Sequence, residues 1–153
     1  LTRRQFFRKT GTGLGVAALA SLLGPRAFGV SEQGEKIAIL AWGSMVTPAE
    51  QVGKELNATV VNMRFVKPLD EELILQLSKE HDLIVTLEEN VLSGGAGSAV
   101  NNLLHRHKIL RHILNIGLPD EFVEQGTREE LLALCGLDKQ GILKQIQEFV
   151  DKK

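Results

Sequence analysis

From residue 36 onward, apolar segments alternate with segments of helical periodicity, and this alternation constrains the fold more than any other feature. An uninterrupted apolar run at residues 37–42 and a β-branched segment at 58–63 are typical of buried strands. Two further strand-like segments follow at 83–87 and 113–116. Strands that alternate with helices require right-handed crossovers. The sequence therefore predicts an α/β fold with a mostly parallel sheet and helices on both faces.

Capping residues indicate where the first two helices begin. Thr47, Pro48 and Glu50 have the order of a capping box with proline in the first turn, so we expect a helix to start at Thr47. Asp70 follows the Pro68 break and is predicted to begin a helix over residues 71–80.

The later helices have equally local signals. A helix is predicted over residues 96–107, and Thr127 with the glutamate three residues later repeats the capping box. Gly136 lies where a helix C-terminal glycine belongs. The last helix, over residues 139–150, places its apolar side chains on one stripe, as expected for a surface helix packed on a sheet.

The first 29 residues have the composition of an export leader. Four basic residues near the start precede a weakly apolar stretch at 12–23, and small residues stand at Ala27 and Gly29. The string at 2–9 (TRRQFFRK) resembles the twin-arginine translocation motif, which would make the twin-arginine translocase a partner. The alternative is an amphipathic N-terminal helix with chance arginines. We thus divide the chain into a leader (1–29), a linker (30–35) and one α/β domain (36–150).

Composition excludes several classes of function. With 18 Lys and Arg against 19 Asp and Glu, the net charge is −1, and beyond residue 9 the basic residues form no cluster that would bind nucleic acid. The chain has no tyrosine and one tryptophan, which disfavours a platform for stacking bases. Cys135 is the only cysteine, so an internal disulfide is impossible, and inert burial is favoured over nucleophilic use.

A glycine-rich segment after the third strand is the main candidate site. Gly94, Gly95, Gly97 and Ser98 lead into a helix, beyond the strand ends where open α/β sheets bind ligands. Such a turn could hold an anion on its backbone amides. The dinucleotide fingerprint is incomplete and no Walker lysine follows, so a structural turn or interface loop is favoured.

Two adjacent glutamates, Glu88 and Glu89, precede this loop together with Asn90. Consecutive strand residues point to opposite faces, so we do not expect the pair to share a proton or a substrate. We expect one carboxylate to face a partner or a helix N-terminus and the other to face solvent. Arg64, after the second strand, could bind an anionic ligand, but pairing with acids of an adjoining domain is favoured.

Three histidines could suggest a metal site. His105 and His107 are two residues apart on the predicted helix, so they point in nearly opposite directions, and His112 lies beyond the helix. Together with the neighbouring lysine and arginines they are better interpreted as a solvated basic face.

Three segments carry a family resemblance. They are residues 57–70 (NATVVNMRFVKPLD), residues 86–98 (TLEEN, then GGAGS), and residues 114–120 (LNIGLPD). In this order they resemble the transketolase C-terminal domain, and specifically that of the 1-deoxy-D-xylulose-5-phosphate synthases. The similarity covers residues 35–149.

The resemblance implies a fold and a wider enzyme. It implies a three-layer α/β/α sandwich with a five-stranded mixed sheet that has one antiparallel edge strand. The full enzymes are homodimers that use thiamine diphosphate and Mg²⁺ to join pyruvate to glyceraldehyde 3-phosphate, for isoprenoid synthesis. In them the C-terminal domain mainly supports the dimer, and no catalytic residue carries over.

The chain departs from the family because it has no Gly-Asp-Gly motif, which holds the diphosphate and metal. We therefore expect it to bind no cofactor and to catalyse nothing alone. Three hypotheses follow: a detached C-terminal domain that needs the missing synthase domains, a non-catalytic dimerisation or binding module, and an exported protein with a recruited domain. The leader predicts a periplasmic location, whereas the family resemblance predicts a cytoplasmic one.

Overall fold

A computed structural model describes residues 36–123 and 125–152, and its secondary structure follows the predicted alternation. The strands are β1 (Ile37–Ala41), β2 (Thr59–Asn62), β3 (Leu83–Val91) and β4 (His112–Leu118). The helices, in chain order, are η2 (Gly43–Met45, a 3₁₀ turn), α3 (Val46–Leu56), α4 (Glu71–Glu80), α5 (Ala96–Arg106), α6 (Arg128–Leu134) and α7 (Lys139–Asp151). No helix among the described residues is long and apolar enough to cross a bilayer.

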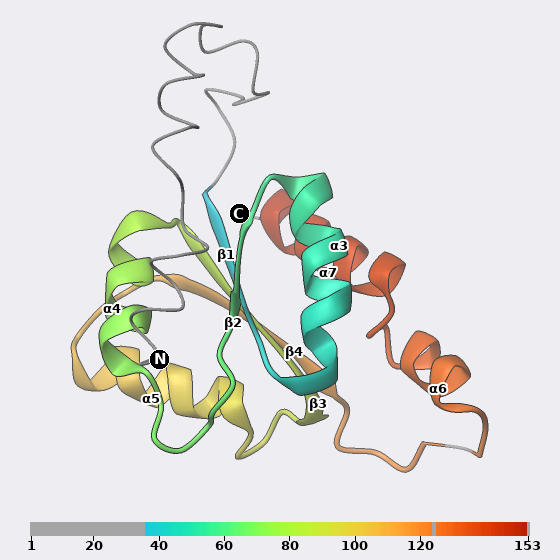
Figure 1. The fold of residues 1–153 in the computed structure, drawn as a ribbon. Coiled ribbons are helices and arrows are strands. Elements are labelled where there is room, and N and C mark those ends of the chain that lie inside the picture. Colours follow the sequence, from blue (N-terminus) through green and yellow to red (C-terminus); the bar gives the residue numbers. More distant parts are fainter. Residues whose placement is uncertain (1–35, 124, 153) are drawn as a thin grey trace, which may run out of the picture. The chain divides into compact units, whose positions relative to one another are not determined.

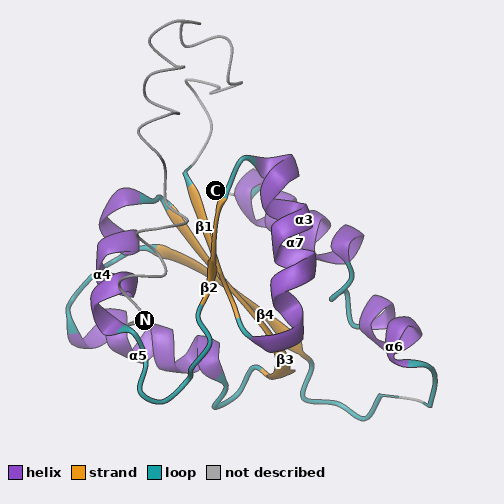
Figure 2. Ribbon diagram, in the orientation of Figure 1, coloured by secondary structure: helices purple, strands orange, loops and turns teal. Residues whose placement is uncertain are grey.

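The strands form one sheet in the order β2-β1-β3-β4, and every pairing is parallel. Helices α3 and α7 lie on one side of this sheet, and α4 and α5 lie on the other (Figures 1 and 2). The predicted three-layer α/β/α sandwich is confirmed. The expected five-stranded mixed sheet is not seen within the described residues, which form four strands and no antiparallel pair.

The sheet is covered on both faces because its central strands are apolar on both faces. All five residues of β1 are buried, and so are the first six of β3. Ile39 and Val85 pack in the cluster that α3 and α7 cover, through residues such as Val52 and Ile146. At about 25 cal/mol per Å² of apolar area, this burial is the main force that holds the layers together.

Most predicted helix ends are confirmed. The Asp70 side chain accepts a hydrogen bond from the Leu73 amide (3.3 Å), and the capping box of Thr127 and Glu130 is complete. Gly136 follows α6 at φ +67°, a left-handed conformation that favours glycine.

The predicted cap of the first helix is wrong. Helix α3 begins at Val46, one residue before Thr47, and Met45 precedes it without a side-chain cap. The reason is the 3₁₀ turn η2, because the Val46 amide donates to the carbonyl of Gly43. The turn supplies a backbone acceptor, so a capping hydroxyl is not needed. The third strand is also longer than predicted and reaches Val91.

Candidate functional site

An open cleft of about 350 Å³ lies at the carboxyl ends of the two central strands. The chain leaves β1 for β2, toward one edge of the sheet, whereas it leaves β3 for β4, toward the opposite edge. This reversal between β1 and β3 is the place where open α/β sheets bind ligands. The cleft is lined by Trp42, Gly43, Ser44, Val66, Glu88, Glu89, Asn90, Gly94, Gly95 and Ala96.

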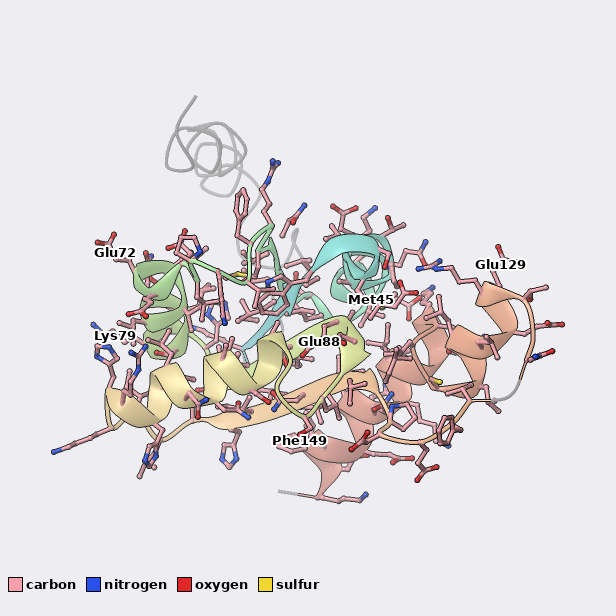
Figure 3. All side chains as sticks on the ribbon, turned by 90° about the horizontal axis from the view of Figure 1, so that it is seen from below. Met45, Glu72, Lys79, Glu88, Glu129 and Phe149 are labelled. Carbon is pink, nitrogen blue, oxygen red and sulfur yellow. The ribbon has the colours of Figure 1, made fainter. Side chains whose placement is uncertain are left out.

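Glu88 joins the end of β3 to the beginning of α5. Its side chain is almost fully buried, and its two carboxylate oxygens accept hydrogen bonds from the amides of Ala96 (2.7 Å) and Gly97 (2.8 Å). Figure 3 shows Glu88 in the interior of the domain, close to the first turn of α5. A carboxylate at a helix N-terminus satisfies free amides and interacts favourably with the helix dipole. The first amides of α5 therefore already have an anionic partner.

Two of the predicted glycines are needed for this close approach. A Cβ atom on Gly95 would lie 2.5 Å from the Glu88 carboxylate, and one on Gly97 would lie 2.6 Å from Thr86 Oγ1. Any larger residue would push α5 away from β3. The glycine-rich segment thus has a packing function, which accounts for the incomplete nucleotide-binding motif.

The turn before α5 is fixed by Ser98. Its hydroxyl donates to the carbonyl of Leu92 (2.8 Å) and accepts from the amide of Gly94 (3.2 Å), which has φ +78°. The cleft wall formed by residues 92–98 is therefore a closed turn with its own hydrogen bonds.

Glu89 points the other way and contacts α6. Arg128 donates to the Glu89 carboxylate from Nε (3.1 Å) and from Nη2 (2.5 Å). The Ser44 hydroxyl donates to the same carboxylate. The Arg128 hydrogen bond first, and the Ser44 hydrogen bond second, lower the pKa of Glu89 below its ordinary value of 4.5. The Glu89 hydrogen bond raises the pKa of Arg128. The two adjacent glutamates thus have separate partners on opposite faces of the strand.

The structure brings most of the predicted site residues together, with one exception. Glu88, Glu89, Asn90, Gly94 and Gly95 line the cleft, and Gly97 and Ser98 support its wall. Arg64 does not line it. It follows β2 at φ 58°, with its amide bonded to the side chain of Asn62 (3.2 Å).

Sequence reasoning missed several residues of this region, namely Trp42, Gly43, Ser44, Val66, Ala96 and Arg128. Trp42 Nε1 donates to the carbonyl of Phe65 (3.3 Å), which ties the end of β1 to the loop after β2. The side chains of Phe65 and Val66 remain exposed beside the cleft. Only the strand order shows that β1 and β3 are neighbours, so no local signal could have joined Ser44 or Arg128 to Glu89.

The arrangement offers little for acid–base chemistry or metal binding. The oxygens of both glutamates are bonded to groups of the domain itself, so neither is poised beside a free proton donor or acceptor. Among the described residues, no three His, Cys, Asp or Glu side chains are placed to hold a metal ion. The sequence has no Gly-Asp-Gly motif, and residues 36–123 and 125–152 offer no cluster of ligands that fits the Mg²⁺ of thiamine diphosphate.

Comparison with known proteins places this fold in a family. Residues 28–142 match the family described as "Transketolase, C-terminal domain", and the chain therefore belongs to it. A split-gene transketolase, described as an inactive β4 tetramer, has a similar structure with a TM-score of 0.70 at 31% identity. That similarity covers 78% of this chain and 40% of the other.

Within this family, the similar sequences include several 1-deoxy-D-xylulose-5-phosphate synthases. The synthase of Hamiltonella defensa is 52% identical over 146 residues, which is 94% of this chain and 23% of the synthase. That of Klebsiella pneumoniae is 54% identical over 144 residues with the same shares, and that of Vibrio parahaemolyticus is 54% identical over 123 residues. The chain thus corresponds to a C-terminal domain fragment of such a synthase and spans less than a quarter of its length.

The coverage also bears on the predicted leader, which lies outside the described residues. Since 94% of a 153-residue chain is about 144 residues, no more than about nine residues fall outside the match. The similarity to the synthases therefore continues into residues 1–29. Part of the predicted leader is therefore similar to the synthases.

Replacing Glu88 tests its role as the anchor of α5. We expect Glu88→Ala to lower the free energy of unfolding by about 1–3 kcal/mol, because two buried amides lose a charged acceptor. Glu88→Gln retains one acceptor oxygen and should cost less. Urea unfolding measures both. The control is Glu129→Gln, since Glu129 lies on the exposed side of α6 (Figure 3). If Glu88→Ala and the wild type had the same midpoint of urea unfolding, Glu88 would not be the anchor of α5.

The contact between α6 and the cleft should weaken in acid. The folded-state pKa of Glu89 lies below 4.5, so the contribution of its charge is complete above the unfolded pKa and is lost as the pH falls through the folded value. The hydrogen bonds with the Thr127 backbone and side chain lower the pKa of Glu130, so the contribution of its charge is also lost as the pH falls. NMR titration from about pH 6 to about pH 3 should move the Arg128 Nε signal with the Glu89 carboxyl signal. In Glu89→Gln that movement should disappear, whereas Glu129→Gln should retain it.

Proposed function

We propose that this chain serves as the C-terminal domain of a 1-deoxy-D-xylulose-5-phosphate synthase and that it is inactive without the remaining synthase domains. The full reaction would join pyruvate to glyceraldehyde 3-phosphate, with loss of carbon dioxide, and the product would enter isoprenoid synthesis. The match to less than a quarter of each synthase carries this proposal. Thiamine diphosphate and Mg²⁺ would be held by the other domains, because the part of this chain that the structure describes has no cluster of ligands for the metal.

The structural neighbour gives a precedent for division between chains. It comes from a split-gene transketolase and is described as inactive. A domain without its own cofactor site can still contribute by fixing the arrangement of the domains that have one. The alternative to a synthase domain is a non-catalytic dimerisation or binding module that has retained the fold.

The proposed contact with the other domains is the rim of the cleft. Phe65 is 51% exposed and Val66 is 40% exposed in the loop after β2, and Val66 lines the cleft together with Gly94 and Gly95. Exposed apolar side chains on a rigid rim are typical of an interface, and the turn is rigid through Glu88 and Ser98. Arg64 precedes this pair and would meet acidic groups of the adjoining domain.

Complementation tests the proposal. The remaining part of the Klebsiella pneumoniae synthase is produced as a separate polypeptide and mixed with this chain, thiamine diphosphate and Mg²⁺. We expect the mixture to consume pyruvate in the presence of glyceraldehyde 3-phosphate. This chain alone should neither do so nor take up the cofactor in calorimetry. Tight cofactor uptake by this chain alone would overturn the proposal.

A matched pair of variants locates the contact within the same experiment. Val66→Asp should reduce the activation by about tenfold or more, because it places an unpaired carboxylate in an apolar contact, where burial of a charge is costly. Leu134→Asp, at an exposed apolar position on α6, should leave it unchanged. Equal activation by the two variants would place the contact elsewhere.

Export by a twin-arginine leader is a second, separable proposal, supported by the order of basic, apolar and small residues in 1–29. The chain, tagged at its C-terminus, should reach the periplasm in a shortened form. With Arg3→Lys and Arg4→Lys together it should remain full-length in the cytosol. The proposal fails if both versions stay in the cytosol uncleaved, which would instead agree with the continuation of synthase similarity into this segment.

A further inference from the structure

The ion pair between Glu89 and Arg128 stands at the rim of the cleft and is open to solvent. Arg128 binds the Glu89 carboxylate through Nε and Nη2, and the Ser44 hydroxyl donates to the same carboxylate. The side chain of Glu89 is 31% exposed and that of Arg128 is 56% exposed. A double hydrogen bond of this kind favours a guanidinium over an ammonium, because the planar guanidinium presents two N–H groups side by side. Glu89 and Ser44 therefore form a binding position for a guanidinium that can be reached from solvent.

Helix α6, which carries Arg128, has few other contacts with the domain. None of its seven residues is buried, and within the described part of the chain it packs closely along no other helix or strand. Figure 1 shows α6 at the periphery, beyond α7. Leu132 and Cys135, toward its C-terminal end, pack against the core. The end of α6 that carries Arg128 is thus held to the cleft mainly by Glu89, and exposed ion pairs are weak.

The cleft beside Glu89 has the surfaces that a second arginine side chain would need. Trp42 and Val66 line it with apolar atoms, against which the hydrocarbon stem of an arginine can pack. Its lining residues include two carboxylates and no lysine, arginine or histidine. Asn90 adds an amide that can bond to a peptide group. The cleft therefore suits a cation with an apolar stem.

We propose that Glu89 and Ser44 form an exchangeable guanidinium site, which Arg128 occupies in the domain by itself and which an arginine of another polypeptide can take over. The incoming arginine enters through the cleft and packs its stem against Trp42 and Val66. Its two N–H groups replace those of Arg128, so the Glu89 carboxylate has the same hydrogen bonds after the exchange as before it. Arg128 and the first turn of α6 are then released into solvent.

Charge and geometry define the class of ligand. Glu88 is already bonded to the first amides of α5, so Glu89 is the carboxylate that a ligand can reach. An anion would be repelled by both carboxylates, and a lysine cannot reproduce the planar pair of N–H groups that Arg128 offers. Arg128 competes with any free guanidinium because it is tethered beside the site. Binding from solution should therefore be weak in the intact chain and tighter when Arg128 is absent.

Binding of N-acetylargininamide to the full chain tests the exchange. Its dissociation constant should fall by about fivefold in Arg128→Ala, because the variant lacks the tethered competitor. The fluorescence of Trp42, the only tryptophan in the chain, should report binding at the cleft. In the wild type the probe should move the NMR signal of Arg128 Nε toward that of free arginine. N-acetyllysinamide, which has the same charge, should bind more weakly, and Glu89→Gln should bind neither compound.

Arg106→Ala is the matched control. Arg106 donates to Glu71 through Nη2 (2.9 Å) in another exposed ion pair, and neither residue lines the cleft, so its removal should leave the affinity at the wild-type value. Equal affinity of Arg128→Ala and Arg106→Ala for the arginine probe would overturn the proposal, and so would equal affinity for the two probes. Arg128→Gln should repeat the result of Arg128→Ala, and the amide signals of β1 and β3 verify that both variants are folded. None of these measurements uses synthase activity, so failure here is distinct from failure of the proposed function.

Discussion

The contact between the Glu88 carboxylate and the first amides of α5 determines how the candidate site is built. A buried charge in an apolar sheet would be costly, but the two amides compensate it because they are otherwise unpaired at a helix N-terminus. The contact requires that α5 approach β3 very closely, and Gly95 and Gly97 permit this approach because they have no side chain. One interaction thus fixes the direction of α5, the shape of the turn before it and one wall of the cleft.

This arrangement also explains why a cleft at the usual ligand-binding position of the fold offers few groups that are free to bind a ligand or take part in catalysis. The amides that would bind an anion already bind Glu88, and the carboxylate of Glu89 is bonded to Arg128 and Ser44. Both carboxylates of the cleft are therefore satisfied by groups of the domain itself. Such a site agrees with the proposed contact between the rim of the cleft and a neighbouring domain.

Much of the fold was predictable from local signals, and the failures have local physical reasons. The strand at 37–42 and the helix that begins after Asp70 were predicted because burial and capping leave traces within a few neighbouring residues. The start of α3 was wrong because a backbone carbonyl of the 3₁₀ turn replaced the expected side-chain cap. The number and direction of strands came from the family resemblance, and the described residues form four parallel strands instead of five mixed ones.

The sequence by itself determined the α/β class, the order of the elements and the opposite orientation of Glu88 and Glu89, since alternation along a strand is a property of the backbone. It also contained the glycines, but not the reason for them. Only the tertiary structure decided that β1 and β3 are neighbours, that Arg128 reaches Glu89 across 39 positions of the chain, and that β4 stands at an edge. These facts depend on the order of strands in the sheet, which is fixed by packing between distant segments and leaves no periodic signal in the chain.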